Sequence, residues 1–82
     1  MATKKQIEDT WDAAKEIRGK SPEVWRRDEE GNVIRRASYG TQGDYGWEID
    51  HRNPVANGGT DNPRNLRALQ WEENREKSDK KE

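Results

Sequence analysis

The chain has 82 residues, enough for one small domain with a thin hydrophobic core. Lys and Arg number 16 and Asp and Glu number 17, so the formal net charge is -1 and the strongly basic balance of many nucleic-acid binders is lacking. The absence of cysteine excludes disulfides and cysteine-based zinc sites, and no apolar run is long enough to cross a membrane. We therefore expect a cytoplasmic protein without membrane contact.

The hydrophobic core is expected to be built on tryptophan. Leu, Ile and Val together number nine and Phe is absent, a content low enough to make disorder a serious alternative. Two features favour a folded chain. The near-neutral charge limits self-repulsion, and each of the four Trp residues can bury a large apolar area. We expect a single domain over residues 1–82, centred on Trp11, Trp25, Trp47 and Trp71.

The first predicted element is a helix over residues 4–18. Its apolar side chains, Trp11 among them, recur near helical spacing and would form one apolar stripe. Thr3 is a suitable N-cap and Gly19 suits the end of a helix. The pattern therefore predicts an amphipathic helix that packs one face on the rest of the domain.

The remainder of the chain predicts strands, loops and one further helix. Residues 24–37 are typical of a β-hairpin, with turn residues between two short strands. A short strand is expected at 47–50, followed by a long polar loop that Pro and Gly punctuate and a second strand at 66–69. Residues 71–79 are expected to be helical. A loop as long as 52–65 in so small a domain indicates a functional role.

Four polar residues at the edges of this strand–loop–strand–helix unit could carry chemistry. Asp50 and Asn74 both offer oxygen ligands with one negative charge between them, which suits a cation that keeps several waters, as Mg²⁺ does. His51 is the only histidine in the chain, and a histidine titrates near neutrality and can accept a proton from water. Asn65 could hold a histidine ring or a loop in place, or cap a turn.

The segment from residue 47 to residue 79 resembles the HNH nuclease motif, the ββα-metal finger. The upstream part resembles small stand-alone HNH proteins that carry a helix and a hairpin before the finger. The resemblance implies an α+β fold in which this finger follows an N-terminal helix and a β-hairpin. The elements that match, in order and with suitable spacing, are Asp50-His51, Pro54, Gly58-Gly59, Asn65-Leu66, Asn74 and Lys77.

The resemblance implies a metal-dependent endonuclease that hydrolyses DNA. His51 would be the general base, Asp50 and Asn74 would hold one divalent cation, and Asn65 would fix the loop and orient the histidine. Mg²⁺ is the expected ion, with Mn²⁺ as an alternative. Because neighbouring strand residues face opposite sides, the strand is expected to twist or end at the Asp50-His51 pair. Many HNH proteins also bind a structural zinc through cysteines, and this chain lacks them.

DNA contacts are expected from basic residues around the motif, chiefly Lys77, Arg52, Arg75 and Arg67. The weak net charge keeps an alternative open, in which the domain binds nucleic acid without cutting it. A related alternative is a nuclease that needs a partner protein for DNA binding or specificity. A homodimer is also compatible with the sequence.

Overall fold

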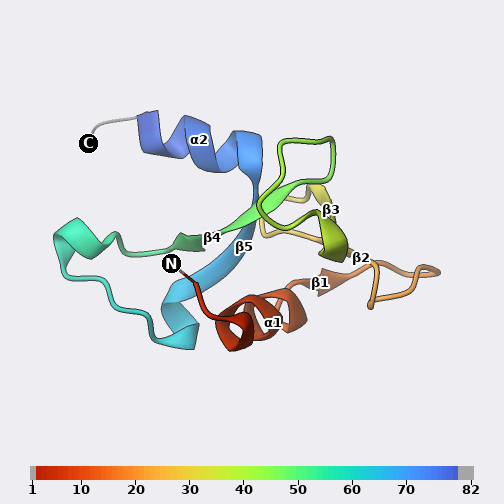
Figure 1. Ribbon diagram of the computed structural model, residues 1–82, viewed down its shortest axis with the longest axis horizontal. Coiled ribbons are helices and arrows are strands. Elements are labelled where there is room, and N and C mark those ends of the chain that lie inside the picture. Colours follow the sequence, from red (N-terminus) through yellow and green to blue (C-terminus); the bar gives the residue numbers. More distant parts are fainter. Residues whose placement is uncertain (1, 80–82) are drawn as a thin grey trace.

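The computed structural model describes residues 2–79 and has the predicted α+β architecture (Figure 1). No helix within these residues has the length and apolar character needed to cross a bilayer. One described sheet has the order β1-β2-β3 and the other pairs β4 with β5, all antiparallel. The α-helices are α1 (Lys4–Asp12) and α2 (Trp71–Asp79), and the strands are β1 (Lys15–Glu16), β2 (Trp25–Arg27), β3 (Val33–Arg35), β4 (Trp47–His51) and β5 (Leu66–Gln70).

The first helix begins as predicted but ends earlier. The Thr3 side chain accepts a hydrogen bond from the backbone of Gln6, whose own side chain accepts one from Thr3, so a full capping box starts α1. The predicted helix over residues 4–18 is wrong beyond Asp12. There the Arg26 guanidinium donates to the backbone oxygens of Asp12 and Ala14, at 3.1 and 2.9 Å. A contact from the hairpin thus captures carbonyls at the helix end.

The predicted hairpin over residues 24–37 is confirmed in its pairing. Strands β2 and β3 are antiparallel, with Arg26 opposite Ile34. The sequence pattern missed a third strand, because β1 adds to the outer edge of β2 and pairs Glu16 with Arg26. Chain that helical periodicity assigned to the first helix therefore joins the sheet, a case of tertiary pairing overriding local preference.

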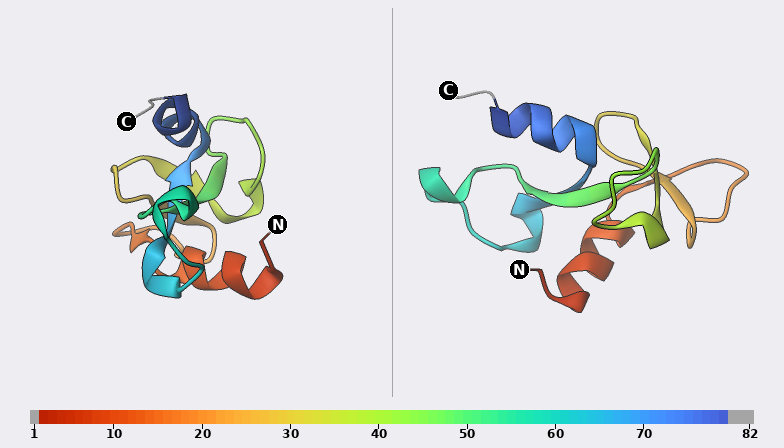
Figure 2. Two further views of the ribbon diagram at one scale, coloured as in Figure 1. Left: turned by 90° about the vertical axis from the view of Figure 1, so that its left-hand side faces the viewer. Right: turned by 45° about the horizontal axis from the view of Figure 1, so that its top comes forward.

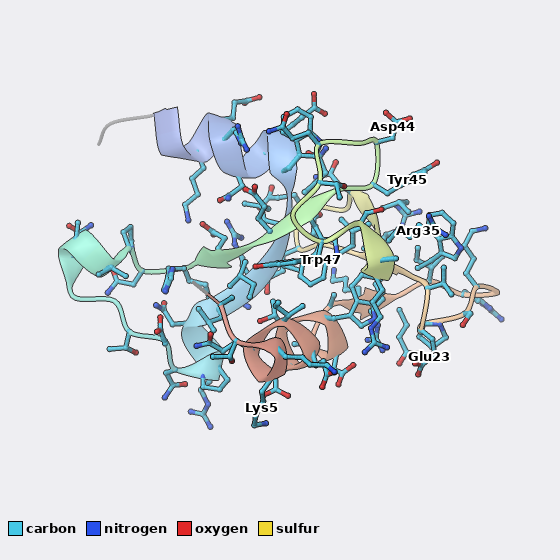
Figure 3. All side chains as sticks on the ribbon, viewed as in Figure 1. Lys5, Glu23, Arg35, Asp44, Tyr45 and Trp47 are labelled. Carbon is cyan, nitrogen blue, oxygen red and sulfur yellow. The ribbon has the colours of Figure 1, made fainter. Side chains whose placement is uncertain are left out.

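The sheet of β4 and β5 lies between the two helices, with α1 against one face and α2 against the other (Figures 1 and 2). Trp47 lies at the centre of the molecule, between the strands and α1 (Figure 3), and its ring packs on that of Trp11 at 5.5 Å. Both rings are buried, together with Ile34 and Ala68. The tryptophan core is thus confirmed for two of the four residues, since Trp25 and Trp71 are only half-buried.

One buried carboxylate joins the two sheets. Asp28, 1% exposed, accepts hydrogen bonds from the backbone of Glu30 and from both the backbone and the side chain of Asn32. It also accepts from the Gln70 backbone, at 2.8 Å. The Gln70 side-chain oxygen in turn accepts from the backbone of Glu72 and Glu73 and caps the start of α2. The hairpin turn therefore sets where the last helix begins.

We predict that Asp28→Ala destabilises the domain by about 3 kcal/mol, because it leaves buried N–H groups without an acceptor. Urea unfolding followed by tryptophan fluorescence measures the change. Asp44→Ala, at an exposed position, should change the stability by less than about 0.5 kcal/mol. Equal effects of the two substitutions would contradict the role given to Asp28.

Candidate functional site

The register of β4 decides which side chains face which helix. Trp47 and Ile49 join the core on the α1 side, and Glu48 and Asp50 make their contacts with α2. As expected, β4 ends at the Asp50-His51 pair, although His51, its last residue, still pairs with Leu66. The alternation of a regular strand therefore places His51 on the opposite face from Asp50.

A surface depression at the end of β4 nevertheless brings the main predicted residues together. It has a volume of about 460 Å³, and Asp50, His51, Asn74 and Lys77 all line it. The first two come from β4 and the last two from one face of α2. Pro54 and Val55, from the loop after β4, line its outer side. Two elements separated by the long loop thus meet at one place, as the predicted site requires.

Asp50 is buried and faces two cations. The Lys77 ammonium donates to Oδ1 at 3.0 Å and to Oδ2 at 2.8 Å, and it also reaches the backbone oxygen of His51 at 3.1 Å. The Arg67 Nε, on the neighbouring strand, donates to Oδ2 at 2.8 Å. A carboxylate that is 8% exposed is stable in its charged form only with such partners.

The Asn74 side chain is held by a residue that the sequence analysis did not single out. Its amide nitrogen donates to Glu48 Oε1 at 2.7 Å, which leaves the amide oxygen as the group available to a ligand. Glu48 also lies 3.7 Å from the guanidinium of Arg75. The alternation along β4 could have indicated this role, since Glu48 lies two residues before Asp50 and hence on the same face.

The imidazole of His51 pairs with an acid from the loop. Its Nε2 lies 2.8 Å from Asp61 Oδ1, and the two residues line a second hollow, of about 220 Å³, with Tyr39 and Leu66. Asp61 could not be found from the sequence, because nothing in the local pattern marks a loop residue that folds back over ten positions. His51 thus lies between the two hollows.

Asn65 holds the loop through side-chain hydrogen bonds to backbone groups, and its second predicted role, orienting His51, stays a prediction. Its side-chain oxygen accepts from the Asn53 backbone at 2.8 Å. Its amide donates to the backbone oxygens of Asn53 and Thr60, at 3.1 and 2.7 Å. Gly59 allows the loop to close, because a Cβ there would lie 1.7 Å from the backbone oxygen of Asn53. The glycine pair therefore serves backbone geometry.

The basic residues predicted to contact DNA all have acidic partners in the structure. Arg52 forms a bidentate ion pair with Glu29, and Arg67 bridges Glu29 and Asp50. Arg75 lies near Glu48 and over the Trp71 ring, and Lys77 contacts Asp50. A phosphate that approached this face would have to compete with these carboxylates.

The ion pairs of this network shift the pKa values of Glu29 and Arg67. The hydrogen bond from Arg52, and secondarily the contact with Arg67, lower the pKa of Glu29 below its ordinary value. Burial of the Arg67 guanidinium disfavours its charge, but the hydrogen bond and charge of Asp50, followed by those of Glu29, outweigh this and raise the pKa of Arg67. Both shifts favour the charged forms, as expected where a carboxylate and a guanidinium lie close to opposite charges.

The donor set around Asp50 fits a cation. Three oxygens, two from the Asp50 carboxylate and one from the His51 backbone, already surround the Lys77 ammonium. The Asn74 amide oxygen belongs to a side chain that lines the same depression. Within the described part of the chain no three His, Cys, Asp or Glu side chains lie close enough to hold a metal. A hard cation here would therefore rely on mixed oxygen ligands and water.

No protein-family model matches the sequence, and comparisons with curated proteins and with solved structures likewise return no match. The case for function consequently depends on the geometry of the residues described above.

We predict that Glu29→Gln lowers the free energy of unfolding at pH 6 by less than about 1 kcal/mol, since Glu29 is a partly exposed partner. Because the pKa of Glu29 is lowered on folding, its contribution is present above pH 4.5, the ordinary value, and is lost as the pH falls through the folded value. Urea unfolding should show the stabilities of the two proteins converging as the pH falls below 4.5. Glu23→Gln, whose parent side chain contacts Arg36 instead, is the matched control, and a difference that persisted at low pH would contradict this linkage.

Proposed function

We propose that the protein is a metal-dependent endonuclease of the HNH type, acting on DNA, in which β4, the loop, β5 and α2 form the ββα-metal unit. The observation that carries this proposal is the convergence of Asp50, His51, Asn74 and Lys77 on one depression. These residues lie 27 positions apart at most, and an antiparallel strand pair followed by a helix brings them together.

The proposed reaction is hydrolysis of a phosphodiester bond. His51 accepts a proton from water, the water oxygen bonds to phosphorus, and the bond from phosphorus to the 3′ oxygen breaks. The leaving oxygen takes a proton from solvent, so the products carry a 5′-phosphate and a 3′-hydroxyl. Asp50 and Asn74 would hold one divalent cation, with Mg²⁺ expected and Mn²⁺ as an alternative, which supplies positive charge at the leaving oxygen.

In this proposal, the Lys77 side chain occupies two alternative positions, one against Asp50 and one at the rim of the depression. Its ammonium lies against both oxygens of Asp50, where a bound divalent cation would also lie. The lysine must withdraw from the carboxylate before Asp50 can act as a metal ligand. An ammonium on a flexible stem that leaves Asp50 remains at the rim of the depression, where it can contact the phosphate of the substrate.

The competition between Lys77 and a metal ion yields a binding prediction. We expect Lys77→Met to tighten Mn²⁺ binding about tenfold, equivalent to about 1.4 kcal/mol, because the Asp50 carboxylate loses a competing partner. Titration of free Mn²⁺ by electron paramagnetic resonance measures this without DNA. Lys5→Met removes an exposed lysine–aspartate pair on α1, where Lys5 projects away from the rest of the molecule (Figure 3), and should leave binding unchanged. Weaker binding in Lys77→Met would contradict the competition.

The nuclease itself is tested on supercoiled plasmid. We expect cleavage with Mg²⁺ or Mn²⁺, none with EDTA, and a loss of at least about a hundredfold in His51→Ala, as removal of a general base should cause. Circular dichroism should show that this variant keeps the wild-type fold. Cleavage that survives the substitution in purified protein would contradict the assignment of the base.

A second candidate is supported by the charge pairing around the site. Every basic residue predicted to contact phosphate already contacts a carboxylate, so the isolated domain should hold DNA weakly. The same scaffold would then bind nucleic acid without cutting it, or would cut only beside a partner that supplies DNA binding. Folded wild-type protein that cuts no plasmid with either metal would favour this candidate.

A further inference from the structure

His51 has a partner that the resemblance to HNH nucleases does not assign. Asp61 Oδ1 lies 2.8 Å from Nε2 of the only histidine in the chain. His51 is the last residue of β4, and Asp61 lies ten positions further on, within the connection between β4 and β5. A carboxylate oxygen can only accept a hydrogen bond, so Nε2 carries the proton in this contact and Nδ1 is left as the acceptor of the neutral ring.

Hydrogen bonds within the loop hold the backbone around Asp61 in a position from which its side chain reaches His51. Asn65 binds backbone groups of Asn53 and Thr60 and thereby joins the two sides of the loop at its base. Next to Asp61, the Asn62 backbone donates to the Thr60 hydroxyl, and the Asn62 side chain accepts from the Arg64 backbone. Local hydrogen bonds therefore surround Asp61 on both sides of the chain.

The loop hydrogen bonds offset the solvent exposure of the His51–Asp61 pair. The side chain of Asp61 is 69% exposed and that of His51 is 31% exposed, so the attraction between them alone would fix little. A carboxylate that the backbone already holds in place loses less entropy when it pairs, and the pair can then persist. Without the loop contacts, His51 at the strand end would be free to rotate between the two hollows that it lines.

We propose that Asp61 is a positioning residue for His51: it fixes the imidazole with Nε2 protonated, so that Nδ1 accepts the proton of the attacking water. This inference rests on the proposed nuclease function and adds to it a residue outside the motif. It also gives the long loop a role, since the loop returns the Asp61 carboxylate to the end of β4.

The contact is tested first without any reaction. In ¹⁵N-labelled full-length protein at about pH 8.5, above the ordinary histidine pKa, the imidazole nitrogen shifts report the tautomer of the one histidine. We expect a single Nε2–H form in the wild type. Asp61→Asn should show a mixture, because an amide can donate to Nε2 as well as accept from it. Asp44→Asn is the control at an exposed aspartate elsewhere. Unchanged shifts in Asp61→Asn would overturn the pairing.

The role in the reaction is tested by plasmid cleavage under Mg²⁺. We expect Asp61→Asn to lower kcat by about 10- to 100-fold with KM unchanged, the usual cost of losing a group that orients a functional histidine. Asp61→Glu, which keeps the carboxylate, should recover part of the loss, and Asp44→Asn should have no effect. An active wild type with an equally active Asp61→Asn overturns the inference and leaves the nuclease standing. An inactive wild type overturns the nuclease, and the catalytic role of Asp61 falls with it.

Discussion

The buried carboxylate of Asp28 is the contact on which the rest of the structure depends. A charge that is 1% exposed would be severely destabilising without partners, yet four N–H groups from three residues donate to it. Three of these bonds shape the hairpin turn, and the fourth fixes the residue before α2. The position of the last helix, and with it the position of Asn74 and Lys77, is therefore set from the opposite sheet. In a domain with so few aliphatic residues, this polar contact fixes the two sheets relative to each other, which a larger hydrophobic core would otherwise do.

Around the candidate site, charges are arranged as a chain of alternating sign. Lys77 and Arg67 flank Asp50, Arg67 continues to Glu29, and Glu29 ends on Arg52. In this region, the opposite charges that give the protein its near-zero net charge are therefore paired with one another and not scattered over the surface. The network holds the strands and helix in register, and it also places cations where phosphate would come. The proposed DNA cleavage would therefore require side chains that stabilise the fold to exchange their carboxylate partners for phosphate.

Local signals in the sequence predicted elements well and tertiary contacts poorly. The start of α1 at Thr3, the hairpin, the two long strands and the final helix followed from caps, turns and periodicity. The end of α1 could not be predicted in this way, because Arg26, from β2, donates a hydrogen bond to the backbone oxygen of Asp12, the last residue of the helix. Likewise, the resemblance implied that Asp50 and Asn74 share one site, and both line one depression together with Lys77. The pairs Asp50 with Arg67 and His51 with Asp61 could not follow, since the first needs the strand register and the second needs the path of an irregular loop.

The loop between β4 and β5 projects beyond the end of the sheet (Figure 1), and the Asn65 amide ties its two sides together at the base. The chain beyond that tie includes the exposed Val55, which lines the outer side of the depression. Extending a loop from a closed base costs little additional entropy, because the closure term grows only with the logarithm of length. The tip is thus a place where this small scaffold can accept insertions and acquire new contacts, while the histidine and its neighbours stay where they are.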